Sequence, residues 1–239
     1  SSMFRAREFR LQRDLDNHAK FLHMPRKKIL IAGSSGLIGT QLVAFLDTGD
    51  HEVWRLVRRE SDPNKNEITW NPSKGEIDSK ELEGFDVVIH LGGVGIGDKR
   101  WSKKRKAAIR DSRVNSSQLL SKTLANLDNK PDLFMLASAI GFYGNRGDEE
   151  LDESSSRGKQ GYFLTDVCSE WENSADPAKE VGIRTISLRT GIVISAVGGA
   201  LGKMLLPAKM GAGGPIGNGK QWMSWISMDD QIYSMYHLM

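Results

Sequence analysis

The sequence of 239 residues predicts an α/β domain built on a doubly wound, mostly parallel sheet. Three observations lead to this fold class. Short apolar runs alternate along the chain with longer stretches of helical periodicity, which is the pattern of β-α-β units. A glycine-rich turn follows the first apolar run directly, and no internal repeat points to a repetitive architecture. Because strand–helix–strand connections are right-handed, such units place helices on both faces of the sheet.

The elements follow in order from a first buried strand at residues 28–32. The next stretch is helical, and Gly49 is placed to end it. Its apolar face is formed by Ile38, Leu42, Phe45 and Leu46. Further strands are expected at residues 52–58, 67–70, 85–91, 132–138 and 183–194, with helices at about 102–127 and 163–181 and a last helix at the end of the chain.

The composition narrows the function classes. Hydrophobic residues make up 39% of the chain and charged residues 26%, and no apolar run approaches the length of about 18 residues that spans a bilayer. The single cysteine, Cys168, cannot form an internal disulfide, and the five histidines are scattered, so we expect a cytoplasmic protein without a metal site. We expect no membrane partner.

The charge of the chain is uneven. The net charge is +3, but residues 1–28 hold eight Lys or Arg against three acids and so carry +5 alone. The remainder is close to neutral, which argues against a nucleic-acid-binding protein. We expect residues 1–25 to form a basic amphipathic connector helix ended by Pro25, although such a helix is also compatible with membrane or nucleic-acid binding. Residues 26–239 would form the α/β domain.

Three glycines follow the first strand at a spacing of three. Gly33 permits a tight turn, Gly36 lets the backbone approach a pyrophosphate, and Gly39 lets the helix pack on the strand. The free N–H groups at the start of the helix add an anion site. In this strand–turn–helix context the spacing predicts dinucleotide binding, with a purely structural turn as the alternative. The predicted loop also contains Ser35, Leu37 and Ile38.

Further motifs point to a family, namely "ITWNP", "LGGVGIGDKRWSKKRK", "SAIGFYG", "GDEELDE", "FLTDVCSEWE", "LRTGIVIS" and "GGPIGNGKQWMSWISMDD". With the glycines, they resemble the extended short-chain dehydrogenase/reductase superfamily, in its atypical branch of epimerase-family or NAD-dependent epimerase/dehydratase proteins, some of which carry the label cell-division inhibitor. The resemblance covers residues 28 to about 238. It implies a Rossmann domain with a small substrate-capping lobe around 195–225, which we expect to be incomplete. It also implies a lipid-binding-like domain upstream, and a homodimer is among the expected assemblies.

The cofactor is predicted from the end of the second strand, "RLVRRE". Val57 stands where NAD-type members carry an acid, and Arg58 follows, whose guanidinium suits a 2′-phosphate. We therefore expect NADP rather than NAD, unless Arg58 and Arg59 are simply solvated. The small residues of Leu91-Gly92-Gly93 match the family's loop under adenine and ribose. The basic residues of 99–106 are most typical of a solvated helix face. The resemblance implies that Arg113, further along the same helix, approaches the cofactor.

The catalytic residues depart from the superfamily pattern. A working reductase uses a tyrosine acid/base and a lysine four residues later, but after Tyr162 that position holds Asp166. Ser138 keeps the place of the substrate-polarising serine, and Tyr143 matches a tyrosine that faces the substrate pocket. We predict Ser138 and Tyr143 as the catalytic pair, with a structural packing role as the alternative for Tyr143. For Arg189 a substrate anion contact and a structural ion pair both remain open.

Two hypotheses therefore stand. The first is an NADP(H)-binding, epimerase-like oxidoreductase that acts on a sugar-nucleotide-like or other small carbonyl substrate. The second is a non-catalytic NADP(H)-binding regulatory or sensor module, which the missing lysine favours. The retained Ser138 and Tyr143 and the long pocket motif favour the first.

Overall fold

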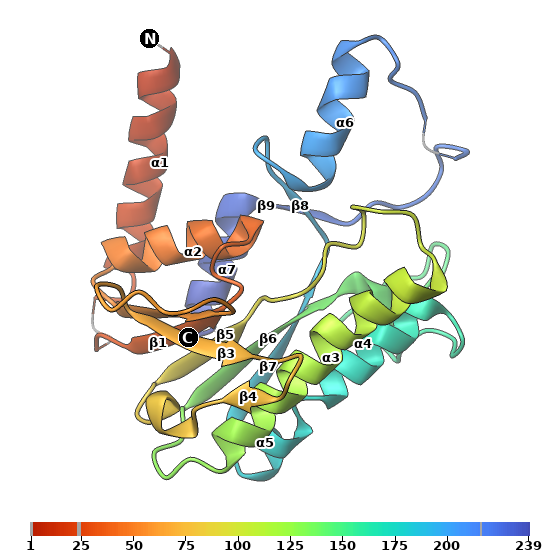
Figure 1. The fold of residues 1–239 in the computed structure, drawn as a ribbon. Helices are drawn as coiled ribbons and strands as arrows, with labels where there is room; N and C mark the ends of the chain where they lie inside the picture. The colour runs from red at the N-terminus through yellow and green to blue at the C-terminus, as the bar shows by residue number, and fades with distance from the viewer. Residues whose placement is uncertain (1, 23–24, 216) are drawn as a thin grey trace.

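The computed structural model describes residues 2–22, 25–215 and 217–239. Its centre is a seven-stranded sheet in the order β4-β3-β2-β1-β5-β6-β7, and only the β3–β4 pair is antiparallel (Figure 1). The strand order reverses between β1 and β5, which is where doubly wound sheets bind ligands. The predicted fold class is thus confirmed. The strands are β1 (Lys28–Ala32), β2 (Glu52–Val57), β3 (Glu67–Asn71), β4 (Glu76–Ile77), β5 (Val87–His90), β6 (Leu133–Ala139) and β7 (Arg184–Thr190).

Helices cover both faces of this sheet because successive strand residues point to opposite sides. In β1, Leu30 and Ala32 face one helical layer, whereas Ile29 and Ile31 face the other. The first layer holds α3 (Lys103–Ala125), α4 (Phe163–Asn173) and α5 (Asp176–Glu180), and the second holds α2 (Leu37–Thr48) and α7 (Met228–His237). Burial on both sides explains why the central strands are continuously apolar.

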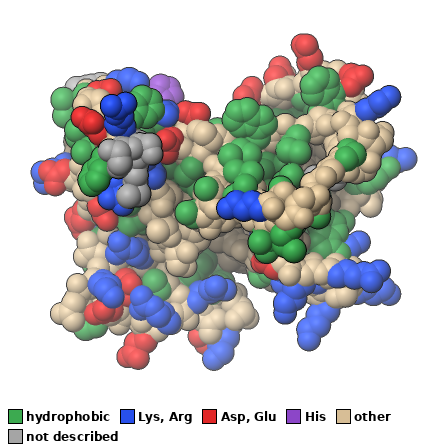
Figure 2. All heavy atoms as spheres, turned by 90° about the horizontal axis from the view of Figure 1, so that it is seen from above, with side chains coloured by type: hydrophobic (Ala, Val, Ile, Leu, Met, Phe, Trp, Pro, Cys, Tyr) green, Lys and Arg blue, Asp and Glu red, His purple; other side chains and the backbone are tan. Residues whose placement is uncertain are grey.

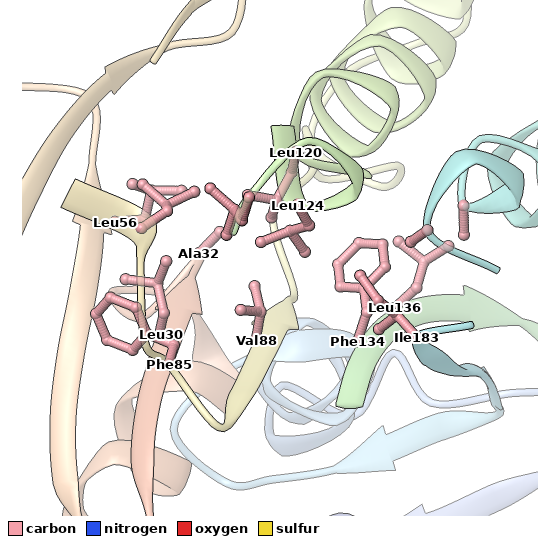
Figure 3. Close-up of a cluster of buried hydrophobic side chains, with 14 of the residues drawn as sticks. Leu30, Ala32, Leu56, Phe85, Val88, Leu120, Leu124, Phe134, Leu136 and Ile183 are labelled. Carbon is pink, nitrogen blue, oxygen red and sulfur yellow. The ribbon is translucent and has the colours of Figure 1, made fainter. Parts of the chain in front are cut away.

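The first layer forms a large apolar cluster with the sheet. Leu120 and Leu124 of α3 point down onto Val88 and Phe134 of neighbouring strands (Figure 3). Ile183, just before β7, closes the cluster at its edge. Full burial of side chains of this size contributes about 1.5–3 kcal/mol each, so this contact holds α3 rigidly against β5.

Two predicted elements are divided in the structure. The helix expected at 163–181 is interrupted at Ser174, whose hydroxyl donates to the carbonyl of Trp171 at 2.5 Å, and α5 restarts with Pro177 in its first turn. The strand expected at 183–194 is split at Gly191, where a Cβ would lie 2.6 Å from the Ser224 hydroxyl oxygen. After this point β8 (Ile192–Ile194) leaves the sheet and pairs with β9 (Trp225–Ser227).

The N-terminal segment forms α1 (Ser2–Ala19), which stands beside α2 and α7 (Figure 1). Polar contacts hold it: Arg13 pairs with Asp230 at 3.2 Å, and Tyr233 donates to Asp14 at 2.7 Å. The apolar positions that suggested a packing face are largely exposed, with Leu11 57% and Leu15 51% accessible. The structure has a helix over these residues, and its attachment is both polar and aromatic, because the His18 ring also stacks on Phe45 with ring centroids 4.1 Å apart. In the described part of the chain, no helix combines the length and apolarity needed to cross a membrane.

Candidate functional site

The glycine turn sits where β1 meets α2, at the point where the strand order reverses. Gly33 has φ +84°, a conformation that favours glycine, and a Cβ there would lie 2.7 Å from the amide nitrogen of Gly92. A Cβ on Gly39 would lie 2.8 Å from the Cα of Ser34 and overlap the carbonyl oxygen of Gly33. Both glycines are therefore required by close approach of backbone to backbone.

Gly36 differs from the other two. Its φ of −76° suits any residue, and a Cβ there would meet only the carbonyl oxygen of Gly33 at 3.3 Å. It is the residue before α2, and the first helical hydrogen bond runs from the Thr40 amide to its carbonyl at 3.0 Å. The amides of Leu37, Ile38 and Gly39 consequently have no acceptor within the helix. These donors, at the positive end of the α2 dipole, suit an anion.

The two arginines after β2 are used differently. Arg59 forms a bidentate pair with Glu67, at 2.8 and 2.6 Å, and this pairing lowers the pKa of the buried Glu67 carboxyl. Arg58 is exposed, and among the described residues no side chain or carbonyl pairs with it. A free guanidinium near the end of β2 fits the 2′-phosphate of an adenosine ribose. The structure therefore separates two residues that are adjacent in the sequence.

Arg113, on α3, contacts the loop that follows β5. Its guanidinium donates to the carbonyls of Val94 and Ile109, at 3.0 and 2.9 Å, and lies where a Cβ on Gly93 would meet it at 3.1 Å. Burial lowers its pKa. Arg113 thus supports the Leu91-Gly92-Gly93 loop from behind, and Gly93 leaves room for it.

A buried histidine beside this loop had no signal in the sequence. His90, the last residue of β5, is fully buried and lies within 3.0 Å of the Ser116 hydroxyl. Its other ring nitrogen lies 3.4 Å from Ser117, which accepts a hydrogen bond from the Trp171 indole. Burial lowers the pKa of His90 to about 4, so the ring is neutral near pH 7. Only pairing between β5, α3 and α4 creates this network.

The predicted catalytic pair lies at the end of β6 and is joined by two residues from elsewhere. Ser138 donates to the Glu172 carboxylate at 2.6 Å, and Tyr143, in the short helix η2 (Ile140–Tyr143), accepts from Arg189 at 3.1 Å. Arg189 and Glu172 form a bidentate ion pair, with both distances 2.9 Å. The ion-pair alternative for Arg189 is therefore the observed one. Glu172 is the last residue of the motif "FLTDVCSEWE", but no spacing in the sequence links it to Ser138.

Tyr162 and Asp166, which occupy the positions of the usual tyrosine and lysine, do not join the Ser138–Glu172–Arg189–Tyr143 network. Tyr162 is 62% exposed just before α4, and Asp166 binds Arg157 at 2.8 Å and the amide of Gly161 at 3.0 Å. Cys168, on the same helix, is buried, and burial raises the pKa of its thiol to about 11. Asp166 therefore organises the loop before α4.

The segment after β8 forms a lobe above these residues. Lys203 of α6 (Gly199–Lys209) binds Asp98 at 2.8 Å, and the Trp222 indole donates to Asp148 at 2.6 Å, so polar contacts join the lobe to the loops that follow the sheet strands. Figure 2, seen from above Figure 1, shows a hollow between two masses of the molecule with hydrophobic side chains gathered beside it. The lobe exposes Val197, Leu206, Met210, Trp222 and Trp225.

Comparison with known proteins agrees with this geometry. The model of the NAD dependent epimerase/dehydratase family matches residues 29–239. The epimerase family protein Mb2239 of Mycobacterium bovis is 42% identical over 212 residues, which are 89% of this chain and 69% of that protein. The crystal structure of the nucleoside-diphosphate sugar epimerase from Corynebacterium glutamicum aligns with a TM-score of 0.84 and 37% identity, over 99% of this chain and 49% of that one.

The crystal structure of the human epimerase family protein SDR39U1 (isoform 2) with NADPH aligns with a TM-score of 0.75 and 30% identity, over 87% of this chain and 68% of that one. The chain thus spans about half of the Corynebacterium protein and about two thirds of the other two. The glycine turn, the strand order and these matches lead to one conclusion: the chain belongs to the NAD dependent epimerase/dehydratase family.

Proposed function

We propose that this protein is an NADP(H)-dependent, epimerase-like oxidoreductase that acts on a sugar-nucleotide-like or other small carbonyl substrate. Two features together carry the proposal. The first turn of α2, after Gly36, has backbone amides without an acceptor in the helix, and Arg58 is exposed with no partner among the described residues. The human relative is described with NADPH, and the Corynebacterium relative is named a nucleoside-diphosphate sugar epimerase, which support the cofactor and the substrate class respectively.

The residues present fit such a cofactor. The amides of Leu37 and Ile38 would bind the diphosphate while Gly36 leaves room for it, and Arg58 would bind the 2′-phosphate. Ser35 completes the turn, and Leu91-Gly92-Gly93 would lie under the adenosine, held from behind by Arg113. When bound, the nicotinamide would supply or accept a hydride. Tyr143, in the short helix η2 directly after β6, is the group we assign to the substrate oxygen.

Two measurements test this proposal. Calorimetric titration should give tighter binding of NADPH than of NADH. A panel of UDP-sugars, aldehydes and quinones, followed by loss of NADPH absorbance or by product analysis, should contain at least one substrate. Tyr143→Phe should abolish most of that turnover, whereas Tyr162→Phe should leave it unchanged because that side chain is exposed before α4. Absence of binding of either nucleotide by folded protein would refute the proposal.

A second function is favoured by one observation. Asp166, in the position of the usual lysine, is committed to Arg157 and Gly161, so it has no role in proton transfer. The alternative is a non-catalytic NADP(H)-binding module. Retained NADPH affinity together with no turnover across the whole panel would support this alternative over the enzyme.

A further inference from the structure

The Glu172–Arg189 pair lies between the two predicted catalytic residues. Glu172 comes from α4 and Arg189 from β7, and they meet beside the end of β6 through the two 2.9 Å contacts. Their side chains are only 10% and 21% exposed. The guanidinium carbon lies 3.6 Å from the centre of the Phe142 ring, so Arg189 is fixed both by a carboxylate and by an aromatic face.

The hydrogen bonds assign a proton to each group. A serine hydroxyl has one proton, and Ser138 donates it to Glu172 at 2.6 Å. Ser138 in this arrangement has no proton left for a substrate oxygen. The Tyr143 oxygen accepts from Arg189, and among the described residues no group accepts the Tyr143 proton. Tyr143 therefore keeps its proton available for donation, and its oxygen already faces a cation.

We propose that Arg189 and Glu172 are positioning residues that act in place of the missing lysine. Arg189 orients Tyr143 and stabilises its anion. Glu172 fixes the position of Arg189 and is itself fixed by the hydrogen bond from Ser138. The inference rests on the proposed oxidoreductase function and adds to it a division of roles. Tyr143 is the proton donor, and Ser138 anchors Glu172 rather than polarising the substrate. The contacts agree with this assignment, because the Arg189 guanidinium donates directly to the Tyr143 oxygen, whereas Asp166, in the place of the usual lysine, pairs with Arg157.

The proposed step conserves atoms and electrons. When bound, the reduced nicotinamide would supply the hydride, with its two electrons, that the carbonyl carbon of the substrate accepts. The C=O π pair becomes a lone pair on oxygen, which takes the Tyr143 proton, and the products are an alcohol, oxidised nicotinamide and a tyrosinate. Arg189, which donates to that oxygen at 3.1 Å, stabilises the tyrosinate until solvent returns a proton.

The experiment measures kcat and KM with NADPH and the best substrate of the panel. Arg189→Gln should lower kcat about 100-fold, a typical effect of losing acid–base assistance, and Arg189→Lys should recover about tenfold of it because the charge is kept. KM for NADPH should change less than about twofold, since Arg189 does not touch the glycine loop. Glu172→Gln should lower kcat as well. Glu170→Gln is the matched control, because Glu170 lies on the same helix and pairs with Arg110 at 2.5 Å, and it should behave as wild type.

A double-mutant cycle separates positioning from structure. In a Tyr143→Phe background, Arg189→Lys should have no further effect on kcat, because it acts through the phenol. Melting temperatures of all variants provide a readout independent of activity, and Arg189→Lys carries the test if Arg189→Gln does not fold. The cycle on melting temperature should also show coupling between positions 172 and 189.

The possible outcomes are distinct. Two results would overturn this inference and leave the oxidoreductase function intact, provided that the wild type turns over substrate. The first is additive effects of Arg189→Lys and Tyr143→Phe on kcat. The second is an equal kcat for Glu172→Gln and Glu170→Gln. No turnover by wild type that binds NADPH overturns both. Non-additive effects with recovery by lysine support the assignment.

Discussion

Replacing Gly36 with alanine tests whether the glycine turn binds a phosphate or only changes the direction of the chain. The fold should tolerate the change, because φ is −76° and the new Cβ would touch only the Gly33 carbonyl oxygen at 3.3 Å. Alanine is a poorer N-cap than glycine by about 0.5–1 kcal/mol. For a domain of this size that cost lowers Tm by about 1–4 °C.

The effect on binding should be much larger. The added methyl group stands at the helix start, where the diphosphate would approach the amides of Leu37 and Ile38. Loss of one hydrogen bond to a charged phosphate costs about 1.5–3 kcal/mol. We therefore expect Kd for NADPH to rise about 10- to 150-fold in Gly36→Ala. Calorimetric titration gives Kd, and circular dichroism on the same samples gives Tm.

The matched control is Gly75→Ala, in the turn between β3 and β4. Gly75 has φ +71°, and a Cβ there would meet no atom within 4 Å, so alanine costs about 1 kcal/mol of backbone strain and nothing in contacts. Its Tm should fall by a similar amount to that of Gly36→Ala, and its affinity for NADPH should be unchanged. If Gly36→Ala bound NADPH as tightly as Gly75→Ala at equal stability, the turn would be purely structural and the reasoning refuted.

Three further predictions concern single side chains. Arg58→Ala should weaken NADPH binding about tenfold without changing NADH binding in paired titrations, and an equal loss of affinity for both nucleotides would contradict the 2′-phosphate role. Arg59→Ala should lower Tm instead, since Glu67 loses its bidentate partner. The pKa of His90 is about 4 in the folded protein, and its ordinary value, which applies to the unfolded chain, is 6.5. Between about pH 4 and pH 6.5, therefore, the unfolded chain binds a proton at His90 and the folded protein does not. Stability should therefore fall by roughly 3 kcal/mol as pH drops from 6.5 to about 4, and urea titrations of His90→Gln should lack this slope. With the thiol pKa raised to about 11 by burial, iodoacetamide at neutral pH should label Cys168 only after unfolding, and rapid labelling of folded protein would contradict its burial.

Local patterns in the sequence were sufficient for the fold class and for most elements. The strand at 28–32 and the helix that Gly49 ends are confirmed, because apolar periodicity and a terminating glycine act within a few residues. The extent of the last long strand was wrong, since the chain changes partner at Gly191: residues up to Thr190 pair with β6, and from Ile192 they pair with β9. The packing of α1 also differed from its pattern: its leucines are exposed, whereas Arg13 pairs with acids of α7 and His18 stacks on Phe45.

The sequence by itself determined the glycine turn, the alternation that builds the sheet and the absence of the usual lysine, because each is a property of neighbouring residues. Only the tertiary structure decided which polar groups meet. Ser138, Glu172 and Arg189 come from β6, α4 and β7, and they join because parallel strands bring their carboxyl ends to one edge of the sheet while α4 packs beside it. The choice between Arg58 and Arg59 was made in the same way, by a buried Glu67 on the neighbouring strand that binds one and leaves the other in solvent.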